Sequence, residues 1–525
     1  MVNEKTDILI IGTGASGAAS AWNLSKLNLK ITCLEQGPLI NKKKYSFNSI
    51  NREINKLNDF NPDPNYRKLH SDYPINSDNS PISIANYNAV GGSTLIYSGH
   101  YPRFHPSDFY TKKIDNIGSN WLFNYYDLEK YYNLNDKMVG VSGLTGDPAY
   151  PKIKNLLPPL NIGYSGELLA KAFNKLGWHW WPSYSAIKKS KKLKKGIRPT
   201  AVEMYLNKAI KNGVIVKPNS RVLKIKVSSK NIATGVIYLE KNKKKIFLEA
   251  SIILLAANGI GTPRILLNSS SKRYPKGLAN SSGQLGKNLM LHPLGYIEGH
   301  FKKFLATNEG AEGCALYSHE FYETNKKRGF KRGYTIQLLK STGPIESFHY
   351  LKKFKKINFG NSFFKNLFDY YGCTIPLAVI CEDTANKNNC IQLDYKNKDS
   401  SGMPGIKINY KLSKNTKKML SHGIKQCKKL LKTAGAKEIF AFGPVRNTGW
   451  HLTGTAKMGR SKRNSVVNKF GQCHDVKNLF IIDSSIFPSS SGVNIASTVQ
   501  AVSLMISDYI KKNLTKLKKN EFKIK

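Results

Sequence analysis

The clearest alternation of apolar and polar stretches lies in the first forty residues. Asp7–Ile11 contains a short, unbroken apolar run, which is typical of a strand covered on both faces. The small and apolar residues of Ala18–Leu27 predict a helix, and Lys30–Leu34 predicts a second strand. This strand–helix–strand order predicts a parallel α/β sheet of the Rossmann-like kind at the start of the chain.

Similar apolar runs return later and predict further strands. They lie at Val214–Val216, Arg221–Val227, Thr234–Leu239, Ser251–Ala256 and Asn478–Ile482. Helices are predicted after the last two, one through Leu267 and the other at Ala496–Tyr509. No apolar run approaches the roughly 18–20 residues of a membrane span, so we expect no transmembrane segment.

The first predicted turn carries the sequence Gly12-Thr-Gly-Ala-Ser-Gly17. Gly12 permits the tight turn, Gly14 lets the backbone approach a pyrophosphate, and Gly17 allows close packing of helix on strand. The helix N-terminus adds free N–H groups, and Glu35 can accept hydrogen bonds from a ribose diol. We therefore predict a site for NAD or FAD rather than NADP, formed by Gly12, Gly14, Ala15, Ser16, Gly17 and Glu35.

Length and composition set wider limits. The chain has 525 residues, whereas a single core stops growing near roughly 250–300 residues, so two or three domains are expected. Hydrophobic residues at 40% and aromatic residues at 11% exclude a largely disordered chain. The net charge of +48 suggests nucleic acid or an anionic surface as a partner. However, the lysines accompany many Asn and Ile residues, as an AT-rich genome would produce, and no nucleic-acid-binding motif is found, so we expect no nucleic-acid partner.

Seven cysteines are spread thinly along the chain without a C-x-x-C pair. This spacing supports neither a zinc ribbon nor an iron–sulfur cluster, and we expect no metal. A disulfide framework is not indicated, which favours a reducing compartment. Lys5 and Asp7 lead straight into the first strand without a signal peptide pattern, so we expect a cytoplasmic protein.

Three other stretches bear on a binding site. The polar residues 41–85 are typical of a long excursion or lid. Residues 300–440 lack a sharp motif and are expected to supply a second sheet and substrate walls. The adjacent glycines near residue 90 suggest backbone that lies against a flat ligand, which makes Gly91, Gly92 and Ser93 candidates.

Five ordered blocks resemble the glucose–methanol–choline (GMC) family of FAD-dependent oxidoreductases, nearly from end to end. The blocks are Gly12–Gly17 with Glu35, Val90–Thr94 with Arg103 and Asp108, Gly259–Ser269, His451–Gly459, and Leu479–Ala501. The strings Pro102–Phe109 and His474–Phe480 are most similar to the bacterial branch of gluconate and other polyol or sugar dehydrogenases.

The resemblance implies an α/β protein (α+β overall) with a Rossmann-like FAD-binding domain that is discontinuous in sequence. This domain is expected at residues 1–299 and 445–525, with substrate-domain insertions such as 41–85 and 156–200. Residues 300–444 are expected to form a substrate-binding domain on a mixed or antiparallel sheet.

The resemblance also implies that the dinucleotide is FAD. It places Asp483 beside the ribityl and pyrophosphate region of the cofactor. With Asp483, it adds three further residues to the expected cofactor site: Val222, Asn494 and Ile495.

Three positions differ from the family pattern and change what is expected of the cofactor and active sites. Ile96 stands where some members carry a histidine bonded to the flavin, so FAD is expected to be non-covalent. Tyr97 replaces a common Asn or His next to it. Leu291 stands where related members often have Asp, so no role is expected for His292.

Oxidation of an alcohol needs a base for the hydroxyl proton, an acceptor for the hydride and stabilisation of negative charge. His451 matches the family's catalytic histidine, and neutral imidazole can accept a proton. Asn494 matches the adjacent family position, where its amide can bind the substrate oxygen, and it also fits an N-cap. We expect hydride transfer from an alcohol, polyol or sugar to flavin N5, with His451 as base. His105, His292 and His474 are expected at the surface or in the core.

Two alternatives remain open. One is a protein that binds nucleic acid or an anionic surface on a non-catalytic flavoprotein scaffold. The other is a flavin monooxygenase or NAD(P)H-dependent reductase, although no second G-x-G-x-x-G follows a predicted strand. The electron acceptor is also open between oxygen, a quinone and a cytochrome partner, and a partner subunit could bring export or membrane association.

Overall fold

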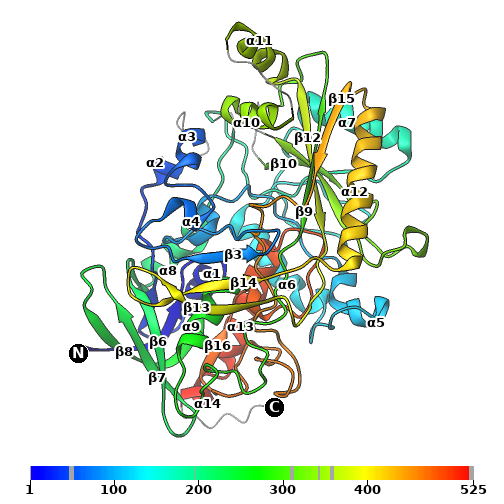
Figure 1. Cartoon of the computed structure of the whole chain (residues 1–525). Coiled ribbons are helices and arrows are strands. Elements are labelled where there is room, and N and C mark those ends of the chain that lie inside the picture. The colour runs from blue at the N-terminus through cyan, green and yellow to red at the C-terminus, as the bar shows by residue number, and fades with distance from the viewer. Residues whose placement is uncertain are drawn as a thin grey trace.

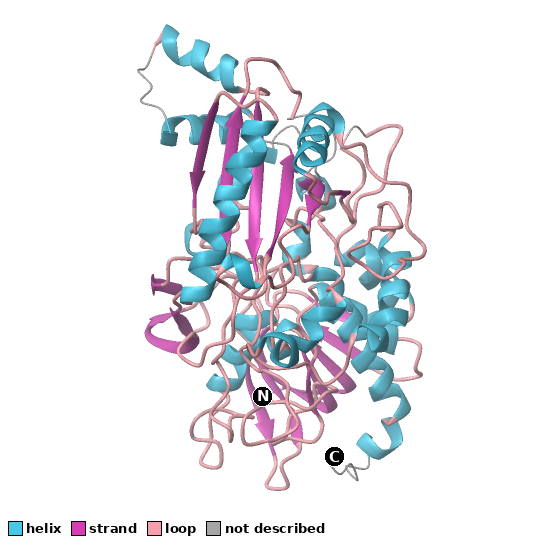
Figure 2. Ribbon diagram, turned by 90° about the vertical axis from the view of Figure 1, so that its right-hand side faces the viewer, coloured by secondary structure: helices cyan, strands magenta, loops and turns pink. Residues whose placement is uncertain are grey.

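The computed structural model describes residues 2–45, 52–193, 195–307, 313–340, 343–354 and 360–518. Within these ranges the strands form three sheets, with helices packed around them (Figure 1). The two larger sheets stand one above the other in Figure 2. Residues 46–51 of the predicted lid and residues 519–525 of the predicted FAD-binding domain lie outside the described ranges.

The first sheet has the predicted Rossmann-like arrangement. Parallel strands follow the order β5, β2, β1 and β8; β16 pairs parallel with the carboxyl half of β8, and β7 and β6 extend the sheet antiparallel from its amino half. The strands are β1 (Val2–Ile11), β2 (Ile31–Leu34), β5 (Ile215–Lys217), β6 (Arg221–Val227), β7 (Ala233–Leu239), β8 (Lys245–Leu255) and β16 (Leu479–Ile481).

Burial explains the apolar runs of the central strands. Ile8–Ile11 and Ile252–Leu255 are buried at every position, because helices and strands cover both faces of the sheet there. β1 begins at Val2, before the predicted start at Asp7, since its polar first residues continue the ladder with β8. A hydrophobic pattern cannot reveal a strand end whose side chains are polar.

Helices from distant parts of the sequence pack together beside this sheet. α1 (Ala15–Leu24) follows β1, and α13 (Ala496–Lys512) follows β16. The hydroxyls of Ser20 and Ser503 lie 3.0 Å apart across the α1–α13 contact, and Ser503 Oγ donates to Ser16 O at 2.8 Å. β16 and α13 therefore return to the N-terminal sheet, as a discontinuous domain requires.

The second sheet is antiparallel throughout, in the order β15, β9, β12, β11, β10, β4. α12 lies against β9, β12 and β15, and α7 packs beside α12 (Figure 1). The bounds are β4 (Trp181–Pro182), β9 (Leu294–His300), β10 (Gly313–Ser318), β11 (Tyr334–Lys340), β12 (Thr374–Cys381), β15 (Glu438–Phe442), α7 (Gly163–Leu176) and α12 (Lys414–Thr433).

One strand of the second sheet crosses an expected domain boundary. β9 begins within residues 1–299, which are expected in the FAD-binding part, yet residues 294–300 pair along their length with β12 and β15. Backbone pairing between segments far apart in sequence decides this, and the sequence of β9 gives no sign of it. The division of the chain into two domains itself stays a prediction.

A small third sheet joins β3 (Ile75–Asn79), β14 (Pro404–Asn409) and β13 (Cys390–Lys398). The predicted lid at 41–85 is thus partly built into the fold, because β3 pairs parallel with β14. Its described helices are α2 (Lys42–Tyr45), α3 (Arg52–Leu57) and α4 (Pro64–Arg67). The other helices of the described chain are α5 (Thr111–Asp115), α6 (Tyr125–Val139), α8 (Asn207–Lys211), α9 (Asn258–Asn268), α10 (Pro344–Phe354), α11 (Asn361–Tyr370) and α14 (Leu514–Lys518).

Two further properties concern the described residues. All seven cysteines are free. No helix in the described ranges has both the length and the apolar character needed to cross a membrane.

Candidate active site

A cavity of about 770 Å³ lies between the first and second sheets. This volume falls within the range of about 300–1,000 Å³ that is usual for small-molecule and cofactor sites. Gly12 after β1, Ala256 after β8 and Asp483 after β16 line it, so the cavity sits at the carboxyl ends of the parallel strands. Gln337 of β11 and Ala378 of β12 close it from the second sheet.

The first turn after β1 shapes one end of the cavity. Gly12 has φ +101°, and a Cβ there would lie 2.5 Å from Ala256 O. A Cβ on Gly14 would meet nothing closer than Gly92 Cα at 3.9 Å, so this backbone is open to a ligand. α1 starts at Ala15 without a side-chain cap, which leaves its first N–H groups free for a phosphate.

Glu35 lies beside this turn and also lines the cavity. Its Oε2 accepts hydrogen bonds from the Thr13 N–H and hydroxyl, each at 3.0 Å, and its Oε1 accepts from Gly37 N–H at 3.0 Å. Burial raises the pKa of Glu35, and these hydrogen bonds offset only part of that rise. Oε2 thus already has two donors, whereas Oε1 can still accept from a further donor, such as a ribose hydroxyl.

Most of the other predicted cofactor residues line the cavity, and two glycines lie just outside its wall. Asp483 lines the cavity and accepts from the Thr262 hydroxyl at 2.5 Å. Gly17 and Gly91 lie outside the lining and act through the backbone: a Cβ on Gly17 would lie 2.0 Å from Gly12 O, and Gly91 has φ +97°. The structure places the others in the cavity wall: Gly12, Gly14, Ala15, Ser16, Gly92, Ser93, Val222, Asn494 and Ile495.

The other end of the cavity carries the predicted catalytic pair. His451 Nε2 lies 3.4 Å from Asn494 Nδ2, although 43 residues separate them in sequence. Gln337 Nε2 donates to Asn494 Oδ1 at 2.7 Å, which turns the Asn494 NH₂ toward His451. Asn494 does not cap α13, because α13 is preceded by Ile495 and has no side-chain cap.

His292, for which the sequence predicts no role, lies against His451. The two Nδ1 atoms are 2.9 Å apart, and His292 Nε2 is hydrogen-bonded to Ser490 Oγ. His100 also lines the cavity, with Nδ1 at 2.7 Å from Ser183 Oγ. Sequence reasoning considered His292 and set it aside, and it missed His100 and Gln337, which reach the cavity from segments without a recognisable motif.

The two other histidines named from the sequence lie elsewhere, as expected. His105 stacks on Tyr322, with ring centres 3.9 Å apart. His474 Nε2 lies 3.0 Å from Ser465 Oγ. Neither histidine lines the cavity.

Burial keeps the histidines of the site neutral. It lowers the pKa of His451 to about 4 and that of His100 to about 3. Burial and, to a smaller extent, the neighbouring His451 hold the pKa of His292 well below its ordinary value. A neutral imidazole keeps a lone pair, so His451 can accept a proton over the physiological pH range.

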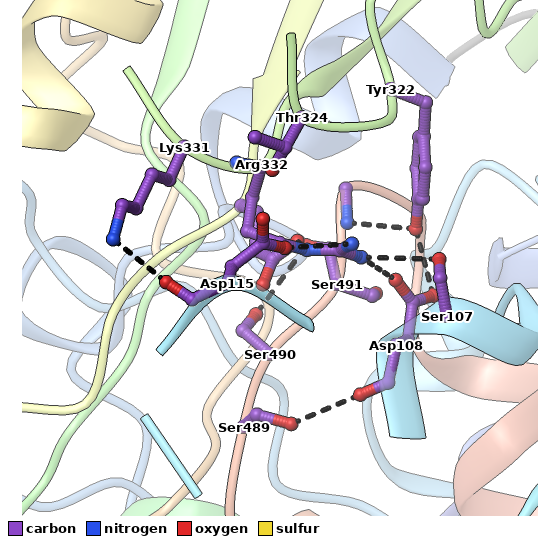
Figure 3. Close-up of polar contacts among 12 residues, drawn as sticks. Ser107, Asp108, Asp115, Tyr322, Thr324, Lys331, Arg332, Ser489, Ser490 and Ser491 are labelled. Atoms are coloured by element: carbon purple, nitrogen blue, oxygen red, sulfur yellow. Dashed lines mark hydrogen bonds and ion pairs between the residues drawn. The ribbon is translucent and has the colours of Figure 1, made fainter. Parts of the chain in front are cut away.

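A buried ionic network braces the loop that carries Ser490 and leads to Asn494 (Figure 3). Arg332 contacts Asp108 at 2.5 Å and Glu382 at 2.8 Å. Tyr322 Oη donates to Asp108 Oδ2 at 2.8 Å and accepts from Gly492 N–H at 3.1 Å. Burial raises the pKa of both Asp108 and Glu382, and the charge of Arg332 opposes that rise.

The two ends of the cavity together fit FAD. The open backbone at Gly14, the free N-terminus of α1 and the Glu35 carboxylate suit the adenosine diphosphate half. The uncapped N-terminus of α13 faces the same cavity through Ile495 and Ala496, and its partial positive charge suits the electron-rich end of a flavin ring.

Family models described as GMC oxidoreductase match this chain at residues 6–294 and 385–503. The chain belongs to the GMC oxidoreductase family. Among curated relatives, 2-methyl-1,2-propanediol dehydrogenase of Mycolicibacterium austroafricanum is 34% identical, with 98% of this chain and 96% of the relative covered. The fructose dehydrogenase large subunit of Gluconobacter japonicus is 25% identical, with 98% and 99% covered.

Solved structures show that this GMC oxidoreductase shares its fold with known flavoproteins. Pyridoxine 4-oxidase from Mesorbium loti aligns with a TM-score of 0.67 at 16% identity, covering 96% of this chain and 99% of the other. Formate oxidase of Aspergillus oryzae aligns with a TM-score of 0.67 at 14% identity, covering 98% and 99%. The resemblance drawn from the sequence is confirmed, and the chain is an FAD-dependent oxidoreductase that acts on CH–OH groups. Family membership does not favour either alternative.

Proposed function

We propose that this GMC oxidoreductase oxidises a small alcohol with more than one hydroxyl group, a diol, polyol or sugar, at His451 and Asn494. One observation carries the proposal: His451 Nε2 and Asn494 Nδ2 lie 3.4 Å apart in the wall of a cavity that also holds the dinucleotide turn. The diol and sugar named for two relatives support the substrate class.

The chemistry of the pair follows from its donors and acceptors. A substrate hydroxyl between the two side chains would receive a hydrogen bond from the Asn494 NH₂ and donate its own hydrogen to His451 Nε2. As the O–H bond breaks, the proton moves to Nε2 and the Asn494 amide stabilises the alkoxide oxygen. FAD, when bound, supplies the hydride acceptor.

The proposal also includes non-covalent binding of FAD. Ile96 lines the cavity at the position where some family members carry the flavin-bonded histidine, and an aliphatic side chain cannot form that bond. Precipitation of the protein with acid should therefore release all yellow colour into the supernatant. Colour that stays with the precipitate would contradict this part of the proposal.

The decisive experiment is anaerobic flavin reduction of purified protein by primary alcohols, diols, polyols, sugars, aldonates and sterols. We expect bleaching near 450 nm by one or more diols, polyols or sugars, and none by NADPH alone. Bleaching by NADPH, or by none of the alcohols, would contradict the proposal. Mixing the reduced protein with oxygen, a soluble quinone or cytochrome c then identifies the class of electron acceptor.

We also propose a cytoplasmic location. Seven free cysteines support a reducing compartment. Fractionation of cells that express the protein tests this, and recovery in a membrane or exported fraction would point to a partner subunit that carries it.

A further inference from the structure

The backbone places His292 and His451 opposite each other. Met290 N–H donates to Thr453 O at 3.1 Å and Thr453 N–H donates to Met290 O at 3.2 Å, which is one antiparallel bridge. His292 comes two residues after Met290, and His451 two residues before Thr453. The bridge brings the two segments together at this point. His292 itself leaves the extended conformation, and the Nδ1 atoms of the two rings lie 2.9 Å apart.

The contact limits where the imidazole protons can lie. Two facing Nδ1 atoms form a hydrogen bond only if one carries a hydrogen and the other is bare. Ser490 Oγ is bonded to His292 Nε2 and lies 3.5 Å from Ser491 O. When the Ser490 hydroxyl donates to that carbonyl, Oγ can accept the hydrogen of His292 Nε2, and His292 Nδ1 is then bare.

We propose that His292, held by Ser490, is a positioning residue that keeps His451 in its Nδ1–H form. His451 then donates from Nδ1 to His292, and its Nε2 lone pair faces the Asn494 NH₂, where the substrate hydroxyl would bind. The opposite form of His451, with hydrogen on Nε2, has no lone pair there and cannot accept the hydroxyl proton. This inference rests on the proposed function, because it assigns the base role to His451.

The backbone at His292 is held in an unfavourable conformation, which supports a specific role. His292 has φ +51° and precedes Pro293, although a residue before proline avoids helical conformations and positive φ is uncommon outside glycine. Asp383 Oδ2 holds the preceding peptide by accepting from Leu291 N–H at 3.0 Å. Conformations of this kind persist where surrounding contacts enforce them, most often at functional sites.

A pair of substitutions separates hydrogen bonding from packing. His292→Asn keeps a short polar side chain that tolerates positive φ and can accept from His451 through Oδ1, whereas His292→Leu removes the acceptor. We expect His292→Leu to lower the rate constant of flavin reduction roughly 10–100-fold, as loss of an orienting partner of a functional histidine does. His292→Asn should recover most of that loss, and both variants should keep FAD and a near-normal KM.

The pH profile provides a second readout. Since burial alone sets the low pKa of His451, the Leu variant should lower the plateau of kcat/KM without moving the midpoint of its acid limb. A midpoint that rises toward the ordinary value near 6.5 would show that water has entered, and that His292 only packs. Rates of His292→Leu within twofold of wild type, or no recovery in His292→Asn, would also overturn the inference.

Ser490→Ala tests the same inference without a change at position 292. It removes the partner of His292 Nε2, so we expect a loss of roughly 2–10-fold, the size of one hydrogen bond. This variant decides the matter if His292→Leu fails to fold, and an unchanged rate would contradict the inference. His451→Ala tells failure of the proposed function from failure of this inference. An active His451→Ala protein would contradict the proposed function. An inactive His451→Ala protein together with a fully active Ser490→Ala protein would contradict only the role of His292.

Discussion

The nucleotide end of the cavity and its catalytic end differ in how the chain assembles them. The nucleotide end consists mainly of one continuous turn, Gly12–Gly17, which offers its open backbone and an uncapped helix N-terminus. The catalytic end joins side chains from four separate segments, namely Gln337, His292, His451 and Asn494. Substitutions at the first end should therefore abolish cofactor binding outright, whereas those at the second should change rates in graded steps.

The largest effect is expected at the nucleotide end, with Gly14→Asp. The empty turn has room for the new side chain, because a Cβ there meets nothing closer than 3.9 Å, but its carboxylate would meet the pyrophosphate. We expect folded protein with FAD content below about a tenth of wild type, measured from absorbance at 450 and 280 nm, since unpaired like charges oppose binding. A fully yellow Gly14→Asp protein would contradict the assigned site.

Gly17→Ala is the matched control for that experiment. Its Cβ would lie 2.0 Å from Gly12 O, so the variant should lose thermal stability even without cofactor. The pair thus separates a glycine that faces the ligand from a glycine that packs α1 on its strand.

At the catalytic end, His451→Ala should have the largest effect. We expect anaerobic flavin reduction to slow by roughly 10²–10⁴-fold, the usual contribution of a general base. FAD should stay bound, because the nucleotide turn is untouched. Equal rates in the two proteins would remove His451 from its role.

The pH dependence of kcat/KM tests whether the pKa of His451 is lowered. A base must be unprotonated, and burial lowers the pKa of His451 to about 4, with His292 and His100 beside it also neutral. Activity should therefore persist as pH falls below 6.5 and be lost only as pH approaches 4, in assays short enough to precede acid unfolding. An acid limb centred near 6.5 would show a hydrated His451.

The lowered pKa of His451 also makes the free energy of unfolding depend on pH. The unfolded chain protonates His451 below about pH 6.5, whereas the folded chain does so only near 4. His451 therefore makes the folded state less stable as pH falls through this window. Thermal unfolding of wild type and His451→Ala at pH 7 and pH 5 should show a smaller pH effect in the variant.

The smallest effect is expected from Gln337→Leu, which frees the Asn494 amide to rotate. One lost hydrogen bond corresponds to a loss of roughly 2–10-fold in the rate of flavin reduction. Gln337→Glu should be slower than Gln337→Leu, because a carboxylate accepts hydrogen bonds and would turn the Asn494 NH₂ away from His451. If the Glu variant matched wild type, Gln337 would have no orienting role.

The comparison also explains what the sequence could predict. The nucleotide turn is local, so Gly12, Gly14 and Glu35 could be named from spacing alone, and the strand–helix order predicted the first sheet. The pair His451 and Asn494 came from family resemblance. His292 was set aside because Leu291 departs from the family pattern, yet Asp383, 92 residues later, supplies a carboxylate to the Leu291 N–H. Contacts of this length depend on how β9 and β12 pair, which no local pattern contains.

The packing of α1 on α13 has a consequence for biosynthesis. Ser20 and Ser503, which meet in this contact, are 483 residues apart. At about 5–20 residues per second, a ribosome needs on the order of a minute to make the second helix after the first. During that time the face of α1 that packs on α13 stays uncovered, and the flavin end of the cavity lacks its helix terminus. Capture of the yellow cofactor should accordingly follow translation, and chains that stop before α13 should emerge colourless and prone to aggregate.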